Sequence, residues 1–326
     1  MRPSGDVEMP AEEQALLRQA RRLEVLTILF LLCAATLLYF TMGASQAMRT
    51  GFFDDLLSTF PAIVFLVSSR LSCRRPDGNH PYGWHKATSV AFLAASLMLF
   101  SVGGLLLMEA VGKFASGERT TIGATQLFGW TIWAGWLMIA AAVVTSIPAV
   151  FLGRAKLKLA PKLHDKVLFA DADMMKADWM VGFGTALAIL GVGLGFWWMD
   201  ALVASLISLD IMRDGGRNTL VALNDLMERR PQKTDGSGPQ PWPDRVRDTL
   251  AALPWVQHAE VRMRESGHVF YGEAFLLVRP GTDDVPARLQ EAEDAARALN
   301  WRVHDLVVTA LPTPEAVRGD DERRSN

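Results

Sequence analysis

Four long stretches of this chain contain no charged side chain, and they constrain the fold more than any other feature. They are residues 25–48, 87–108, 120–153 and 179–199. Each stretch reaches the ~20 residues that a helix needs to cross a hydrocarbon core of about 30 Å, and each is too long for the buried helix of an ordinary soluble domain. The sequence therefore predicts a protein that crosses the membrane several times.

Two shorter uncharged segments, residues 56–69 and 201–209, are bracketed by acidic residues and complete a set of six predicted spans. Basic residues gather before the first span and after the second, fourth and sixth spans. Because positive charge is retained on the cytoplasmic side, both termini are predicted to be cytoplasmic. An aromatic belt would then mark the outer interface, formed by Trp130, Trp133, Trp136, Trp197 and Trp198.

Beyond residue 230 the composition changes to a linker rich in proline, glycine and serine, PQKTDGSGPQPWP. The pattern that follows is helix, strand, strand, helix, strand, which is typical of a small ferredoxin-like α+β domain. The predicted organisation is a cytoplasmic N-terminal segment (1–22), a six-helix transmembrane domain (23–230), the linker (231–243), a cytoplasmic α+β domain (244–312) and a disordered tail (313–326).

Neither a signal peptide nor a structural disulfide is expected. The first residues lack an early apolar core and a cleavage pattern. Cys33 lies in the first predicted span and Cys73 in a basic loop, so the two thiols are not expected to pair.

The stretch FADADMMKADW, residues 169–179, places carboxylates where a membrane helix begins. A carboxylate near the bilayer centre costs about 2.5–3.5 kcal/mol even on lenient scales, so it is a functional candidate by default. If the helix starts near Leu168, Asp178 lies about 15 Å along its axis, near the membrane midplane. Heptad spacing puts His164, Asp171 and Asp178 on nearly one face, as a polar stripe that leads in from the cytoplasm.

The second predicted span supplies matching oxygen ligands. Asp54 and Ser58 lie one helical turn apart on one face, and Asp55 shares the next face with Thr59. Two carboxylates and a hydroxyl that meet at the midplane would bind a hard divalent cation. Because such ligands must lose protons to bind, the same groups can exchange a metal ion for protons. These residues therefore predict the chemistry of a metal/proton antiporter.

A structural interpretation of these acids stays open. They would then pair with Lys176 or Arg49, or cap helix ends at the membrane interface. This alternative applies most to Asp55, Asp171 and Asp173. An interfacial or structural role is also expected for Asp200, Asp210 and Glu109.

With these residues in this order along the chain, the sequence resembles the cation diffusion facilitator family of divalent-metal/proton antiporters. Its likeness is to a divergent subgroup of that family. The likeness covers nearly the whole chain and is carried by DDLLSTFPAIVFLVSSRLSCRRPDGNHPYGWHKA, LLLMEAV, ADADMMKADW, MDALVASLISLDI and the hairpin RESG…FYGEAFLLV. It implies a homodimer whose cytoplasmic domains meet. It also implies alternating access driven by the proton gradient, and export of metal without a permanent cofactor.

The resemblance assigns a transport site with two ligands four residues apart on each of the second and fifth spans. These positions hold Asp54, Ser58, Met174 and Asp178. Two of these four residues are the expected carboxylates, and Asp55 or Asp171 would complete the coordination sphere of the metal ion. His164 and Asp171 would line the access route. No histidine lies inside a span, so manganese, iron or cobalt is as plausible a substrate as zinc.

The resemblance places a second metal site in the loop between the second and third spans. Asp77 and His80 match it, whereas the third position is Trp84 and His85 follows directly. The candidate loop ligands are therefore Asp77, His80 and His85. The alternative is a loop in which NHPYG only sets a turn.

In the cytoplasmic domain, the family's ligand positions hold Ala259, Phe275 and Thr309. No family-type binuclear site is therefore expected, and the domain would serve dimerisation. The histidines there are expected to be structural: His258, His268 and His304.

The leading hypothesis is a homodimeric, proton-coupled exporter of Mn, Fe, Co or Zn in a bacterial cytoplasmic membrane. One alternative is a non-transporting family member that acts as a dimerisation partner or metal-linked scaffold. Another is a proton-coupled carrier for a different small cation. An enzyme is not expected, because no hydrolytic triad, phosphate loop or haem motif stands out. No nucleic-acid partner is expected either.

Overall fold

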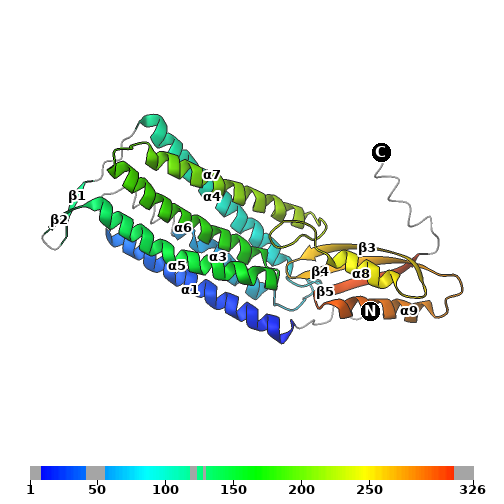
Figure 1. Cartoon of the computed structure of the whole chain (residues 1–326). Coiled ribbons are helices and arrows are strands. Elements are labelled where there is room, and N and C mark those ends of the chain that lie inside the picture. The colour runs from blue at the N-terminus through cyan, green and yellow to red at the C-terminus, as the bar shows by residue number, and fades with distance from the viewer. Residues whose placement is uncertain (1–8, 42–55, 118–122, 128–129, 312–326) are drawn as a thin grey trace.

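The computed structural model describes residues 9–41, 56–117, 123–127 and 130–311. Within these ranges, six helices form an elongated bundle, and a small α+β domain lies at one end (Figure 1). The bundle helices are α1 (Ala11–Thr41), α3 (Thr59–Leu71), α4 (Lys86–Ser116), α5 (Ala134–Leu163), α6 (Lys166–Gly193) and α7 (Met199–Leu226). The predicted fold class, a helical bundle followed by an α+β domain, is confirmed.

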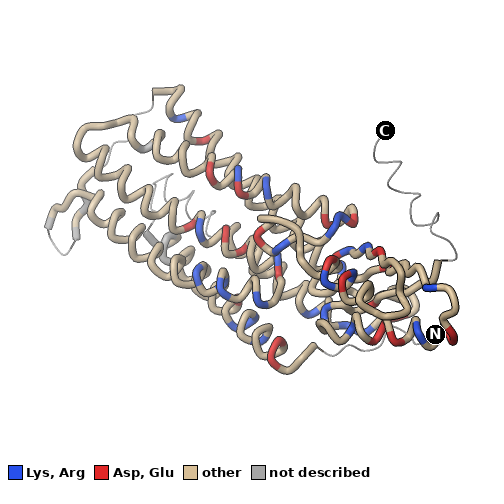
Figure 2. The backbone as a smooth tube through the Cα atoms, turned by 45° about the vertical axis from the view of Figure 1, so that its right-hand side comes forward, with Lys and Arg blue, Asp and Glu red and all other residues tan. Residues whose placement is uncertain are grey.

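Length and composition qualify α4, α5 and α6 to cross a membrane, and α3 is a shorter apolar helix. The helices extend beyond the uncharged runs on the side of the α+β domain, since α6 begins at Lys166. Figure 2 shows that charged residues concentrate toward that domain, whereas the opposite end of the bundle is almost free of them. The charge distribution therefore distinguishes the two ends.

The uncharged run over residues 120–153 holds the start of the helix α5, but it is not helical throughout. Strands β1 (Ala124–Leu127) and β2 (Trp130–Trp133) pair antiparallel, and α5 begins only at Ala134. The segment contains threonine, isoleucine and tryptophan, which favour strands over helices. The absence of charge identified an apolar segment, and the local residue types set its secondary structure.

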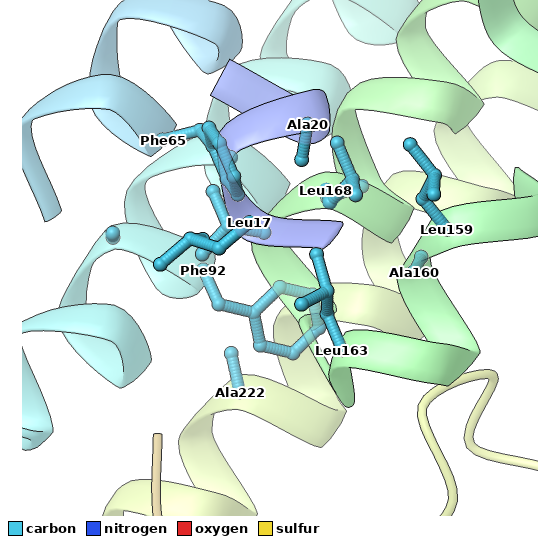
Figure 3. Close-up of a cluster of buried hydrophobic side chains, with 13 residues drawn as sticks. Leu17, Ala20, Phe65, Phe92, Leu159, Ala160, Leu163, Leu168 and Ala222 are labelled. Carbon is cyan, nitrogen blue, oxygen red and sulfur yellow. The ribbon is translucent and has the colours of Figure 1, made fainter. Parts of the chain in front are cut away.

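Apolar side chains from all six described bundle helices meet in one buried cluster (Figure 3). Representatives, in helix order, are Leu17, Phe65, Phe92, Leu159, Leu168 and Ala222. Helices α4 and α7 pack closely at positions where a glycine leaves room. A Cβ at Gly103 would lie 2.7 Å from the backbone nitrogen of Met212. Small residues at such contacts let membrane helices pack backbone to backbone.

The α+β domain follows the predicted order of elements. It comprises α8 (Trp242–Ala251), β3 (Val256–Ser266), β4 (Val269–Val278), α9 (Val285–Leu299) and β5 (Val303–Leu311). The sheet order is β3-β4-β5, with β3 and β4 antiparallel and β4 and β5 parallel. Val246 and Leu250 of α8 and Ala292 of α9 pack on Phe270 of the sheet in one apolar core.

Candidate functional site

The structure brings Ser58 and Asp178 together, as the sequence predicted for the second and fifth spans. Ser58 directly precedes α3 and is 1% exposed, and Asp178 lies half-buried in α6. The Ser58 Oγ hydroxyl donates a hydrogen bond of 2.8 Å to Asp178 Oδ1. The two helices therefore present oxygen atoms to one another inside the bundle. Asp54 and Asp55 lie outside the described residues.

Met174 lies one helical turn before Asp178 but faces a different neighbourhood. Its side chain is 1% exposed and belongs to an apolar cluster with Leu99, Val102 and Ile211 of α4 and α7. Ser58, by contrast, approaches Asp178 from the side of α3. Met174 therefore packs in an apolar cluster, and its role as a metal ligand stays a prediction.

Asp171 takes part in a separate, fully buried ion cluster. Lys156 of α5 donates to Asp171 and, at 2.9 Å, to Glu24 Oε2 of α1. All three side chains are 0% exposed. The cluster holds α1, α5 and α6 together, and it is the kind of pairing foreseen in the structural alternative. The partner described for Asp171 is Lys156, whereas Lys176 pairs with α7 and Arg49 lies outside the described residues.

Lys176 and Asp173 point toward α7. The ammonium of Lys176 lies 2.9 Å from Asp210 Oδ2 and 2.8 Å from Asp214 Oδ2. Asp173 Oδ2 accepts a hydrogen bond of 2.8 Å from Asn218 Nδ2. These charged residues thus join α6 to α7, and the structural role expected for Asp210 fits this arrangement.

His164 ends α5 in a left-handed conformation, with φ of 52°, and is buried between the bundle and the α+β domain. Its Nδ1 lies 3.2 Å from both Thr234 Oγ1 and Gln240 Nε2. Its Nε2 lies 3.3 Å from Glu265 Oε1. The structure thus brings neither His164 nor Asp171 to the contact between Ser58 and Asp178, and the access-route role stays a prediction.

A buried polar junction, which the sequence did not predict, surrounds His164. Lys166 at the start of α6 lies 2.6 Å from Asp225 of α7 and 2.9 Å from Glu265 of β3. Burial alone would raise the pKa of Glu265, but the neighbouring His164 and Lys166 lower it below its ordinary value. The ionised carboxylate therefore helps to fix β3 against the bundle.

The turn between α5 and α6 receives two further contacts from the α+β domain. Arg302 donates to the carbonyls of Leu163 and Lys162 at 3.0 and 2.8 Å. His268 Nε2 lies 3.4 Å from Asp165 Oδ2, and burial lowers the pKa of His268. Because α6 carries Asp178, these contacts tie the α+β domain to the helix of the candidate site.

The three candidate loop ligands do not converge. Asp77 Oδ1 lies 3.1 Å from His80 Nδ1 and accepts the backbone N–H groups of Asn79 and His80. Hydrogen bonds led by that from the His80 backbone hold the pKa of Asp77 below its ordinary value. His80 stacks on Trp84 at 3.6 Å, whereas His85 faces the α+β domain. Among the described residues, no group of three metal-binding side chains forms.

Strand β2, the start of α5 and the end of α4 lie at the end of the bundle remote from the α+β domain (Figure 1), and these segments carry several aromatic residues. The rings of Trp133 and Trp136 meet edge to face at 6.0 Å, and Phe114 stacks on Trp197 at 6.4 Å. Tryptophan at the end of a membrane bundle typically lies at the headgroup level. This placement agrees with the interface that the sequence predicted.

The family model of the cation efflux transmembrane domain matches residues 24–227, which cover all six described bundle helices except residues 11–23 of α1. The chain therefore belongs to the cation efflux family, a family of multi-pass membrane transporters rather than enzymes.

Curated relatives support the same assignment at low identity. The manganese efflux system protein MneS of Bacillus subtilis is 26% identical over 169 residues, which are 52% of this chain and 54% of the relative. The cation-efflux pump FieF of Shewanella oneidensis is 28% identical over 209 residues, 63% of this chain and 66% of FieF. The magnetosome protein MamM of Paramagnetospirillum magneticum is 24% identical over 243 residues, which are 73% of this chain and 70% of MamM. The chain thus spans 54% of the length of MneS.

Proposed function

We propose that this protein exports divalent metal ions from the cytoplasm in exchange for protons, with Asp178 at the centre of the transport site. The observation that carries the proposal is the hydrogen bond between Ser58 and Asp178, which joins α3 and α6 inside the family's transmembrane domain. Asp54, one turn before Ser58 in sequence, would supply the second carboxylate. Met174 would hold the fourth position, next to the apolar cluster in which its side chain packs.

The donor set favours a hard cation. Carboxylate and hydroxyl oxygens suit Mn²⁺ and Fe²⁺, whereas imidazole, which Zn²⁺ prefers, is absent from this set. Among Mn, Fe, Co and Zn, we therefore propose manganese or ferrous iron as the preferred substrate. The relative MneS is named as a manganese efflux system protein, which supports this direction.

Proton coupling would follow from the same carboxylates. A carboxylate binds a metal ion only when it is deprotonated, so protons and metal compete for Asp178. Exposure of the site to a more acidic exterior would protonate it and release the ion. Return to the cytoplasmic side would release the proton and allow another metal ion to bind.

The assembly we propose is a homodimer in a bacterial cytoplasmic membrane, with both termini in the cytoplasm. The charged end of the bundle, next to the α+β domain, would face the cytoplasm, because positive charge is retained there (Figure 2). The α+β domain would then be cytoplasmic and would supply the dimer contact.

A second candidate function is that of a non-transporting partner or scaffold, and one observation favours it. Met174 carries no oxygen and packs in an apolar cluster, so the four-residue site would contain only three oxygen-bearing side chains. Such a protein would fold and dimerise through its α+β domain but would not move metal.

Metal uptake into proteoliposomes with an imposed pH gradient separates the two functions. We expect uptake of Mn²⁺ or Fe²⁺ above that of Co²⁺ and Zn²⁺, and its loss in Asp178→Asn. The matched control is Asp173→Asn. It removes a carboxylate of the same helix, α6, and that carboxylate bonds to Asn218 of α7. Uptake of none of the four ions by folded dimers would support the non-transporting function.

A further inference from the structure

We propose that the outward-facing sides of α1 and α5 bind an anionic phospholipid at the end of the bundle next to the α+β domain. Arg22 of α1 and Lys158 of α5 would hold its phosphate groups, and both side chains are exposed. The contact between Ser58 and Asp178 lies inside the bundle, so the two sites are separate and the proposal does not depend on metal transport.

Helices α1 and α5 lie side by side and run in opposite directions (Figure 1). Near the start of α1, Glu13 accepts a hydrogen bond of 2.9 Å from Trp301 of the α+β domain. At the end of α5, the Lys162 carbonyl accepts a hydrogen bond of 2.8 Å from the neighbouring Arg302. The start of one helix and the end of the other therefore reach the same part of the small domain.

The buried ion pair between Glu24 and Lys156 sets the two helices at a common level. Arg22 lies two residues from Glu24, and Lys158 lies two residues from Lys156, each in the direction of the α+β domain. At a rise of 1.5 Å per residue, both basic residues lie about 3 Å beyond the ion pair. The antiparallel packing therefore brings Arg22 and Lys158 to the same depth in the membrane.

Each basic residue continues an apolar stripe on the outside of its helix. A helix turns by about 100° per residue, so Arg22 and Lys158 lie almost opposite their buried neighbours Glu24 and Lys156. Exposed apolar side chains follow at helical spacing toward the middle of the bundle: Leu26 and Leu29 on α1, and Phe151, Ile147 and Val144 on α5. Acyl chains would cover these stripes, and a headgroup would then lie on the basic residues.

The basic residues on this side of α5 are left without acidic partners. Arg154, Lys158 and Lys162 are exposed and one turn apart, and the sequence of α5 contains no aspartate or glutamate. Within the part of the chain that the structure describes, neither these three residues nor Arg22 forms an ion pair. Lys156 on the buried side, by contrast, pairs with two carboxylates. The positive charge on the outer side is therefore available to an anionic ligand.

Helix α7 shows that exposed basic residues at this end of the bundle are not always arranged in this way. Arg213 and Arg217 are also exposed and one turn apart. Asp210 and Asp214 lie among them on α7, and acidic charge there offsets the positive charge. Orientation in the membrane requires only that basic residues lie on the correct side. Their alignment on one acid-free face of α5 needs a further reason.

An anionic phospholipid fits both the charge and the apolar stripes. Lysine and arginine residues close to the membrane surface attract anionic headgroups, and each raises the affinity by about fivefold. Arginine binds phosphate through two parallel hydrogen bonds, whereas lysine acts as a point charge. Because packed helices lie about 8–10 Å apart, a lipid with two phosphate groups would reach Arg22 and Lys158 together. We therefore expect such a lipid to bind more tightly than one with a single phosphate.

The test is native mass spectrometry of the full-length protein in detergent, titrated with cardiolipin, phosphatidylglycerol or phosphatidylcholine. We expect the affinity to fall in that order. The double variant Arg22→Gln with Lys158→Gln should bind cardiolipin at least tenfold more weakly. Arg22→Lys with Lys158→Arg keeps both charges and should bind like wild type. The matched control is Arg213→Gln with Arg217→Gln, which removes the same charge from α7 and should leave binding unchanged.

The proposal is overturned if the double glutamine variant binds cardiolipin as wild type does, or if the α7 control loses as much binding. Equal binding of cardiolipin and phosphatidylcholine by wild type would also overturn it. Displacement of cardiolipin by excess inorganic phosphate would show that the ligand is a free anion instead. Size-exclusion profiles identify any variant that does not fold. In that case Arg18→Gln with Lys162→Gln decides, because these exposed residues lie one turn further along the same two helices.

Discussion

The replacement of Lys156 by methionine tests the buried ion cluster that joins α1, α5 and α6. Lys156 lies between Glu24 and Asp171, and none of the three side chains is exposed. Methionine has a similar length and no charge, so it leaves two carboxylates buried without their cation. Removal of one partner from a buried ion pair costs about 3–5 kcal/mol. We expect Lys156→Met to lower the free energy of unfolding by that amount.

The assay is equilibrium unfolding in detergent micelles, followed by tryptophan fluorescence. Lys158→Met is the matched control, because Lys158 is exposed two positions further along the same helix, and its effect should stay within about 0.5 kcal/mol. A triple variant with Glu24→Gln, Lys156→Met and Asp171→Asn removes all three charges and should recover most of the loss. The reasoning is refuted if Lys156→Met unfolds like Lys158→Met.

Three further predictions concern other parts of the molecule. Gly103→Ala should destabilise the packing of α4 on α7 by about 1–3 kcal/mol in the same unfolding assay, whereas Gly104→Ala should not, because nothing lies within 4 Å of a Cβ at Gly104. The pKa of His85 falls from 6.5 to about 4 on folding, so the unfolded chain binds more protons between these values and stability rises with pH there. The thermal unfolding midpoint of wild type should therefore fall from pH 7 to pH 5, and that of His85→Gln should fall less. Met174→His adds an imidazole one turn from Asp178 and should raise Zn²⁺ uptake relative to Mn²⁺, and an unchanged ratio would mean that the ion does not contact position 174.

The bundle and the small domain were predictable because their signals are local. Long runs without charge mark helices that can lie in a bilayer, and alternating apolar residues mark the strands of the sheet. The hairpin β1-β2 was missed because a run without charge does not distinguish a strand from a helix. From the positions of Ser58 and Asp178 along their helices, the sequence predicted that the two side chains would meet inside the bundle, and a hydrogen bond joins them there.

The pairing of buried charges could not be predicted in the same way. Lys156 lies 132 residues from Glu24 in sequence, and only the packing of α5 on α1 brings the two together. The same holds for Lys166 and Glu265, which are 99 residues apart and belong to different domains. His85 was assigned to the loop on its sequence neighbours, and the docking of β5 places it beside His304.

The central claim is that Asp178 couples metal to protons, and the internal pH of metal-challenged proteoliposomes tests it most directly. Liposomes with a trapped pH dye and an acidic interior are given external Mn²⁺ while metal uptake and internal pH are recorded together. We predict that the interior becomes more alkaline in step with uptake in wild type and in Asp173→Asn, and that both signals are lost in Asp178→Asn. Metal uptake that leaves internal pH unchanged, or persists in Asp178→Asn, would contradict this account.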